Sequence, residues 1–191
     1  MKVKWLMILS VVFVLSACTL NKQEITEREI YQDAIPVSEK TEEHVIVELK
    51  DATDKKVGQV VLFENNTGVT VRLKAENLPP GKRAFHIHET GKCEKPDFKS
   101  AGSHYNPYQK EHGFDNPKGP HAGDLPNIEV GADGKVEVEL NAPLVTLQEG
   151  KENSLKDLDG SAFIIHAGAD DYSTDPVGNT GERIVCGVLQ K

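Results

Sequence analysis

The chain has 191 residues, of which 38% are hydrophobic and 27% are charged, and its formal net charge is −8 at pH 7. This composition is typical of one globular domain with additional segments attached. An acidic surface repels nucleic acid and anionic lipid headgroups, so nucleic acid is not expected to be a partner.

The N-terminal segment has the pattern of an export signal. After the basic start MKVK comes an apolar run over residues 5–17, WLMILSVVFVLSA. A membrane-spanning helix needs about 20 apolar residues, so this shorter run is better interpreted as the core of a signal peptide. It ends in LSAC, which resembles a bacterial lipobox. We therefore predict a lipoprotein signal peptide over residues 1–17 and lipidation of Cys18; an ordinary signal peptide followed by an unrelated cysteine is the alternative.

Residues 18–43 are polar and show no sustained strand alternation, which indicates a flexible tether. This tether connects the predicted lipid to a folded domain, which we predict over residues 44–191. The protein is then expected to be exported and anchored on the extracytoplasmic side of a bacterial cell membrane. Because the chain is acidic, the lipid has to hold it at the membrane without a basic patch.

The chain has three cysteines, an awkward number for an exported protein. If Cys18 carries lipid, Cys93 and Cys186 remain as an even pair in an oxidising compartment. A bridge between them would stabilise the fold by about 4–5 kcal/mol on the chain-entropy model. Two unpaired thiols are the alternative.

From residue 44 onward the sequence predicts β-structure. Short runs rich in Val, Leu and Ile are separated by turn signals, and they lie at residues 44–50, 57–64, 68–76, 84–89, 161–168 and 183–189. Within residues 127–140, NIEVGADGKVEVEL, two strands flank the pair Asp133-Gly134, which is a strong hairpin signal. No stretch shows sustained helical periodicity. The pattern favours an all-β sandwich or flattened barrel of about eight antiparallel strands.

Two segments do not fit this strand pattern. Residues 89–127 and 167–182 are predicted loops, and the first is rich in His, Gly, Pro and Asp. Structureless loops of this length are usually disordered or functional. Something other than a hydrophobic core is expected to order the first of them.

Six of the seven histidines lie in or beside these two loops, and only His44 lies elsewhere. His86 and His88 alternate with apolar residues in FHIH, so both imidazoles lie on one face of a strand. Imidazole is a good ligand for zinc and copper, and the His121-x-x-Asp124 pair adds an oxygen that zinc accepts. No cysteine lies among the candidates. The pattern predicts a metal site, with room for two ions.

The segments FHIHETGKC, SAGSHYNP, KEHG, HAGDLPN, FIIHAGADD and GNTGERIVCGVL together resemble the copper,zinc superoxide dismutase family, in its secreted bacterial branch. The resemblance spans roughly residues 44–190, and the motifs follow the order of the family. It implies an eight-stranded antiparallel Greek-key barrel or sandwich with two long functional loops.

The resemblance also assigns roles to individual residues of this sequence. It implies four copper ligands, namely His86, His88, His104 and His166. It implies four zinc ligands, namely His104, His112, His121 and Asp124, so that His104 bridges the two ions. Asp170 matches a carboxylate that links a copper ligand to a zinc ligand, and Arg183 matches the arginine beside the copper. Cys93 and Cys186 match the disulfide of the family.

The activity that this resemblance implies is disproportionation of superoxide to dioxygen and hydrogen peroxide, with copper and zinc as cofactors. Residues 167–182 contain no lysine, unlike the animal members, so this loop is not expected to guide the anion. A copper- and zinc-binding lipoprotein for metal storage or delivery is the alternative function. The resemblance is compatible with a monomer and with a homodimer.

Overall fold

A computed structural model describes residues 44–191, so the predicted signal peptide, Cys18 and the tether lie outside the described residues. Within this range the protein is an all-β structure with a single short 3-10 helix, η1 (Lys99–Ala101). The nine strands are β1 (His44–Asp51), β2 (Lys56–Asn65), β3 (Gly68–Ala75), β4 (Gly81–Arg83), β5 (Phe85–His88), β6 (Ile128–Val130), β7 (Val136–Ala142), β8 (Ser161–His166) and β9 (Arg183–Leu189). In the described part of the chain, no helix has the length and apolar character needed to cross a membrane.

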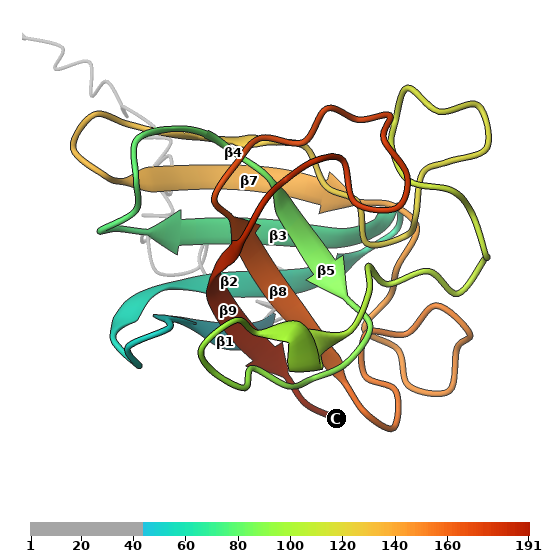
Figure 1. The fold of residues 1–191 in the computed structure, drawn as a ribbon. Coiled ribbons are helices and arrows are strands. Elements are labelled where there is room, and N and C mark those ends of the chain that lie inside the picture. The colour runs from blue at the N-terminus through green and yellow to red at the C-terminus, as the bar shows by residue number, and fades with distance from the viewer. Residues whose placement is uncertain (1–43) are drawn as a thin grey trace, which may run out of the picture. The chain divides into compact units, whose positions relative to one another are not determined.

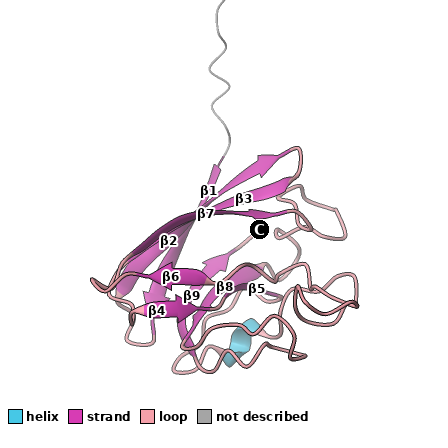
Figure 2. Cartoon of the chain, turned by 90° about the horizontal axis from the view of Figure 1, so that it is seen from above, coloured by secondary structure: helices cyan, strands magenta, loops and turns pink. Residues whose placement is uncertain are grey.

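Seven strands form one antiparallel sheet in the order β5-β8-β9-β1-β2-β3-β7, and β4 pairs with β6 in a second, two-stranded sheet. The large sheet curls, so that β5 and β8 cross in front of β2 and β3 (Figure 1). Figure 2 shows the two ends of this curl and the short β4–β6 pair between them. Because β4 and β5 are separated only by Ala84, they act as one strand that changes partner. The predicted all-β antiparallel fold is confirmed.

The strands form because their apolar residues alternate. In β3 the inward positions Val69, Val71 and Leu73 are at most 1% exposed, whereas Arg72 and Lys74, which alternate with the inward positions, face solvent. Alternation of this kind buries one face of each strand, and the buried faces of the curled sheet meet in one core. Burying each such side chain contributes roughly 1.5–3 kcal/mol, so the core supports the rigid frame that carries the loops.

The predicted hairpin at Asp133-Gly134 is only partly present. The chain does turn there, since the N–H of Gly131 donates to the carbonyl of Lys135 over 2.8 Å. The two flanking strands nevertheless do not form a ladder with each other: β6 pairs with β4, and β7 pairs with β3 along its whole length. The reason is that the two strands diverge from the turn, because β7 joins β3 in the large sheet and β6 joins β4 in the two-stranded sheet.

Both long loops have the predicted bounds. Residues 89–127 connect β5 to β6 and include η1, and residues 167–182 connect β8 to β9. The loops contact each other: the N–H of Asp115 in the first donates to the carbonyl of Tyr172 in the second over 3.0 Å. Figure 1 shows the first loop in green and yellow and the second in red, next to each other at one side of the strands.

Candidate metal centre

Strand β5 carries the first two histidines of the site. His86 and His88 occupy alternate positions, and Phe85 and Ile87, at the other two positions of the strand, belong to the core. All four side chains are fully buried, which means that the histidine face of the strand is covered as well. His166 ends β8, the strand that pairs with β5, so the strand pairing brings three imidazoles to one place.

The first long loop covers the free edge of β5 with its backbone. The N–H of Ile87 donates to the carbonyl of Gly123 over 2.9 Å, and the N–H of Tyr105 donates to the carbonyl of Ile87 over 2.8 Å. Two isolated β-bridges result, one pairing His88 with His104 and the other pairing His86 with Asp124. Gly123 allows this approach, because a Cβ there would overlap the carbonyl oxygen of Ile87. Backbone pairing therefore sets which loop residues face the strand histidines.

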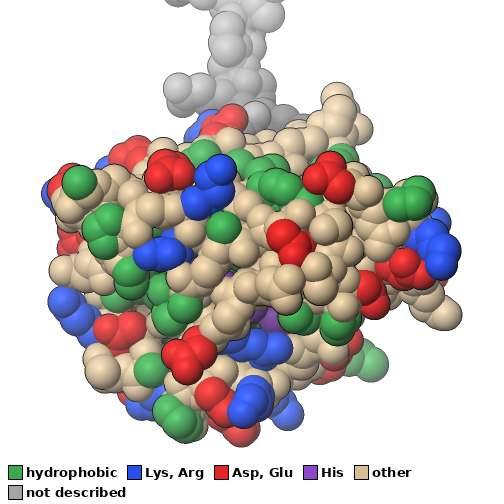
Figure 3. Space-filling view, turned by 45° about the horizontal axis from the view of Figure 1, so that its top comes forward, with side chains coloured by type: hydrophobic (Ala, Val, Ile, Leu, Met, Phe, Trp, Pro, Cys, Tyr) green, Lys and Arg blue, Asp and Glu red, His purple; other side chains and the backbone are tan. Residues whose placement is uncertain are grey.

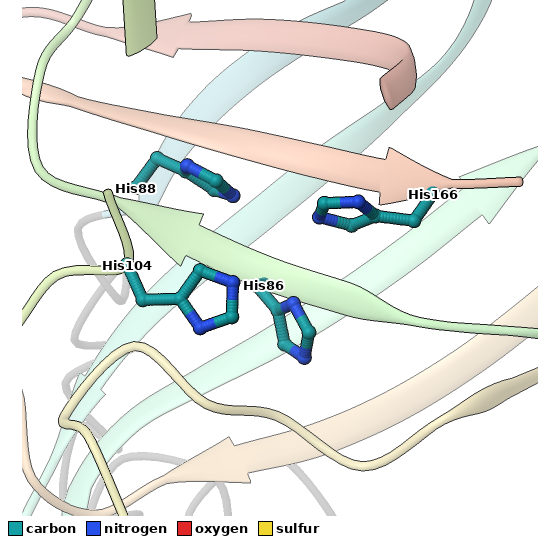
Figure 4. Close-up of side chains that lie close together, drawn as sticks. All are labelled: His86, His88, His104 and His166. Carbon is teal, nitrogen blue, oxygen red and sulfur yellow. The ribbon is translucent and has the colours of Figure 1, made fainter. Parts of the chain in front are cut away.

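The structure brings all seven predicted ligands together in two groups that share His104. The first group contains only imidazoles, from His86, His88, His104 and His166; its ligating atoms lie within 4.8 Å of one another. Figure 4 shows His86 and His88 on β5, His166 at the end of β8 and His104 on the loop. One nitrogen of each ring is buried without a hydrogen-bond partner, namely His86 Nδ1, His88 Nε2, His104 Nε2 and His166 Nε2. Buried polar atoms are rarely left unpaired, so these four nitrogens point to an ion as their partner.

The second group surrounds the carboxylate of Asp124. Its Oδ1 lies 2.9 Å from His104 Nδ1, 3.1 Å from His112 Nδ1 and 3.3 Å from His121 Nδ1. The other oxygen accepts hydrogen bonds of 3.0 Å from the N–H groups of Gly113 and His121, which fix the carboxylate. Three imidazole nitrogens and one carboxylate oxygen form a donor set that suits tetrahedral zinc. All members are buried, so water has little access to this group.

In four of the rings, those of His86, His88, His112 and His166, the remaining ring nitrogen bonds to the protein. Asp170 bridges the two groups, with Oδ2 at 2.8 Å from His86 Nε2 and Oδ1 at 3.0 Å from His112 Nε2. His88 Nδ1 lies 3.0 Å from the carbonyl of Gly102, and His166 Nδ1 lies 3.1 Å from the hydroxyl of Thr180. Bonds of this kind fix the tautomer and the orientation of a ligating ring. Sequence reasoning identified Asp170 but not Thr180 or Gly102.

Burial favours the neutral form of three rings of the first group, because it lowers their pKa values. It lowers the pKa of His104 to about 4 and the pKa of His166 to about 3, and it lowers the pKa of His88 well below its ordinary value. A neutral imidazole has a free lone pair, which is the form that binds a metal. Burial also acts to lower the pKa of His112, but the hydrogen bonds to Asp124 and Asp170 outweigh burial and raise this pKa to about 9.

Arg183 begins β9 beside the first group. Its guanidinium is half-buried and donates to the carbonyl of Phe98 over 2.8 Å and to the carbonyl of Gly102 over 2.7 Å. Arg183 lines a cavity of about 430 Å³ together with His104 and Lys110, and the carboxylates of Glu89, Glu111 and Asp175 also belong to its lining. Figure 3 shows a small area of histidine side chains at the floor of a depression, next to Lys or Arg side chains. An anion entering there meets a fixed positive charge.

The disulfide between Cys93 and Cys186 is confirmed, and it joins the start of the first loop to β9. It packs with Phe98, Ala101 and Ile164 in a small apolar cluster separate from the main core. Phe98 is therefore fixed both by this cluster and by its hydrogen bond to Arg183. The alternative of two unpaired thiols is excluded.

The donors fit copper and zinc. An all-imidazole group suits copper, and a group of three imidazoles and one carboxylate suits zinc. Fold and site together define a class: an antiparallel β-barrel metalloprotein in which one histidine is shared by two metal-binding groups. Comparison with known proteins identifies the family, because residues 56–189 match the family model described as copper/zinc superoxide dismutase. The chain belongs to this family.

Individual relatives agree with this assignment. The chain is 54% identical over 137 residues to superoxide dismutase [Cu-Zn] 1 of Aquifex aeolicus, covering 71% of this chain and 81% of the relative. A crystal structure of a SOD-like protein from Bacillus subtilis has 53% sequence identity and a TM-score of 0.74, covering 75% of this chain and 97% of that one. The Cu/Zn superoxide dismutase from Brucella abortus is 34% identical with a TM-score of 0.62, covering 77% and 99%.

Proposed function

We propose that this protein is a superoxide dismutase, which converts two superoxide anions and two protons to dioxygen and hydrogen peroxide. We assign His86, His88, His104 and His166 as the copper ligands. We assign His104, His112, His121 and Asp124 as the zinc ligands, with His104 shared. Family membership and the chemistry of the two groups support this assignment.

The observation that carries the proposal is the position of His104 between the two groups. Its Nδ1 lies beside Asp124, whereas its Nε2 is buried without a partner and faces the other imidazoles. A protein that only stored metal would have no need for a shared ring. A ring placed in this way would give one nitrogen to a redox-active ion and the other to a redox-silent one.

When bound, copper supplies one-electron transfer and zinc supplies a fixed positive charge. The side chains of the protein bind the anion, hold a proton and orient the ligand rings. Arg183 offers two N–H groups held by backbone carbonyls, so its charge stays beside the cavity and binds the superoxide anion. His104 also lines this cavity, and its Nε2, which faces the other imidazoles, can hold and return a proton that peroxide formation needs. Asp170 keeps the rings of His86 and His112 in their orientations.

The test is superoxide consumption by the purified, metal-loaded protein. We expect it to exceed that of the same amount of free copper, whereas a storage or delivery protein would show no excess.

Arg183→Glu is expected to slow turnover by roughly 10- to 1,000-fold at unchanged copper and zinc content, since it replaces a fixed cation by an anion. Arg183→Lys, which keeps the charge, is the matched control, and its turnover should fall less than that of Arg183→Glu. Turnover of Arg183→Glu equal to that of the wild type would contradict the role of Arg183.

We also propose that Cys18 is lipidated and that the protein is anchored on the extracytoplasmic side of a bacterial membrane. The support is the apolar run of residues 5–17, which ends in LSAC. Stable anchoring requires more than one acyl chain when no basic patch contributes. Cys18→Ala is expected to move the protein from the membrane fraction to the soluble fraction, with its dismutase activity retained. A wild-type protein found only in the soluble fraction would refute the anchor.

A further inference from the structure

Asp170 connects the two metal-binding groups, but its own position depends on residues outside them. The amide of Asn127 pairs with the backbone of Asp170 in both directions: Nδ2 donates to the carbonyl over 2.9 Å, and Oδ1 accepts from the N–H over 2.8 Å. Asn127 is the last residue of the first long loop, and Asp170 lies in the second. The pairing therefore fixes one loop against the other at the residue whose carboxylate orients two rings.

Tyr172 completes a closed ring of hydrogen bonds with these two residues. Its N–H donates to Asp170 Oδ1 over 2.7 Å, and its phenolic oxygen accepts from the N–H of Asn127 over 2.8 Å. The backbone of Tyr172 has φ 61°, a left-handed conformation that a non-glycine residue keeps only when its surroundings hold it. The carboxylate of Asp170 thus has one bond that does not go to an imidazole, and Tyr172 supplies it.

The same tyrosine reaches the zinc side of the site. Its ring packs edge-on against Phe114, with centroids 5.6 Å apart, and its carbonyl accepts from the N–H of Asp115 over 3.0 Å. Phe114 follows Gly113, whose N–H binds the carboxylate of Asp124. A displacement of Tyr172 is therefore transmitted to Asp170 on one side and to the segment that holds Asp124 on the other.

We propose that Asn127 and Tyr172 are positioning residues of the metal centre, which hold the Asp170 carboxylate between His86 and His112. The orientation of His86 in the copper site then depends on the contact between the two long loops. This inference rests on the proposed function, since it takes His86 and His112 as ligands.

The test uses Tyr172→Phe, which removes the phenolic oxygen but keeps the ring on Phe114. Two quantities are measured in the full, zinc-loaded chain: the ¹⁵N shifts of the His86 ring before copper is added, and the copper affinity by competition with a chelator. We expect the His86 shifts to change and the copper affinity to fall about 10-fold, the lower end of the range for residues that support a ligand. Tyr108→Phe is the matched control, because Tyr108 lies on the first loop and is 41% exposed; it should change neither quantity.

A second comparison separates positioning from a general effect on folding. The double variant Asp170→Asn, Tyr172→Phe should bind copper with the same affinity as Asp170→Asn alone. The reason is that Tyr172 acts on the site through the Asp170 carboxylate, which both variants lack. A full additional loss in that background would overturn the proposal, as would unchanged His86 shifts in Tyr172→Phe alone. A wild-type chain that binds no copper but shows the expected shift in Tyr172→Phe would refute the proposed function and support the positioning role.

Discussion

Replacing His104 by alanine is expected to lower the content of copper and zinc together and to abolish most of the dismutase activity. The reason is that one ring supplies a nitrogen to each group, so a single substitution removes a ligand from both. Replacing a residue that only supports a ligand typically costs about 10- to 100-fold in metal affinity or activity, and the loss of a shared ligand should exceed this range. Metal analysis of the dialysed protein and superoxide consumption measure the two effects.

The control for this substitution is His44→Ala, which removes the one histidine that lies outside both groups. It should leave metal content and activity at the wild-type values. Loss of copper alone from His104→Ala, with zinc affinity and the order of the first loop unchanged, would contradict the shared ligand. In that case the carboxylate of Asp124 with His112 and His121 would suffice for zinc.

Removing the disulfide is expected to cause a large loss of stability. Cys93 and Cys186 are 93 positions apart, and closing a loop of that length stabilises the folded chain by about 4–5 kcal/mol in the chain-entropy model. For a chain of this size, the double variant Cys93→Ser, Cys186→Ser should therefore melt roughly 10–20 °C lower. Thermal or denaturant unfolding of the metal-free protein, free of the contribution of bound ions, provides the measurement.

Reductant supplies the matched control for this variant. It should lower the melting temperature of the wild type towards that of the double variant and leave the double variant unchanged. A wild type that melts at the same temperature with and without its disulfide would disprove the stabilisation. The activity should fall as well, because the bridge fixes the segment that contains Phe98, one of the two carbonyl partners of Arg183.

The strand pattern and the presence of a metal site were both readable in the sequence for physical reasons, whereas the division of the ligands between copper and zinc came from the family resemblance. Alternation in runs such as GVTVRLKA follows directly from burial of one face of a strand, and this predicted β3 and its neighbours. The bounds of the loops 89–127 and 167–182 followed from where that alternation stops. The histidines lie in or beside these two loops. Their position indicated a metal, because a bound metal can order a long loop that lacks an apolar core.

Other features depend on partners that no local pattern specifies. The turn at Asp133-Gly134 was predicted, but the choice of β4 as the partner of β6 follows from closure of the curled sheet. The carbonyl of Gly102 serves both His88 and Arg183, and a backbone atom leaves no signal in the residue type. Asn127 and Tyr172 are separated by the strands β6, β7 and β8, so only the folded chain shows that they meet.

The β-bridges from the first loop to β5 have a consequence beyond the positions of the ligands. β5 lies at one end of the strand order of the large sheet, so its outer edge would otherwise present unpaired N–H and C=O groups. Such an exposed edge is a template for pairing between molecules, and proteins usually protect it. Here the backbone at Tyr105 and Gly123 occupies it. The loop segments that carry the candidate metal ligands therefore also shield this edge of the sheet from edge-to-edge pairing between molecules.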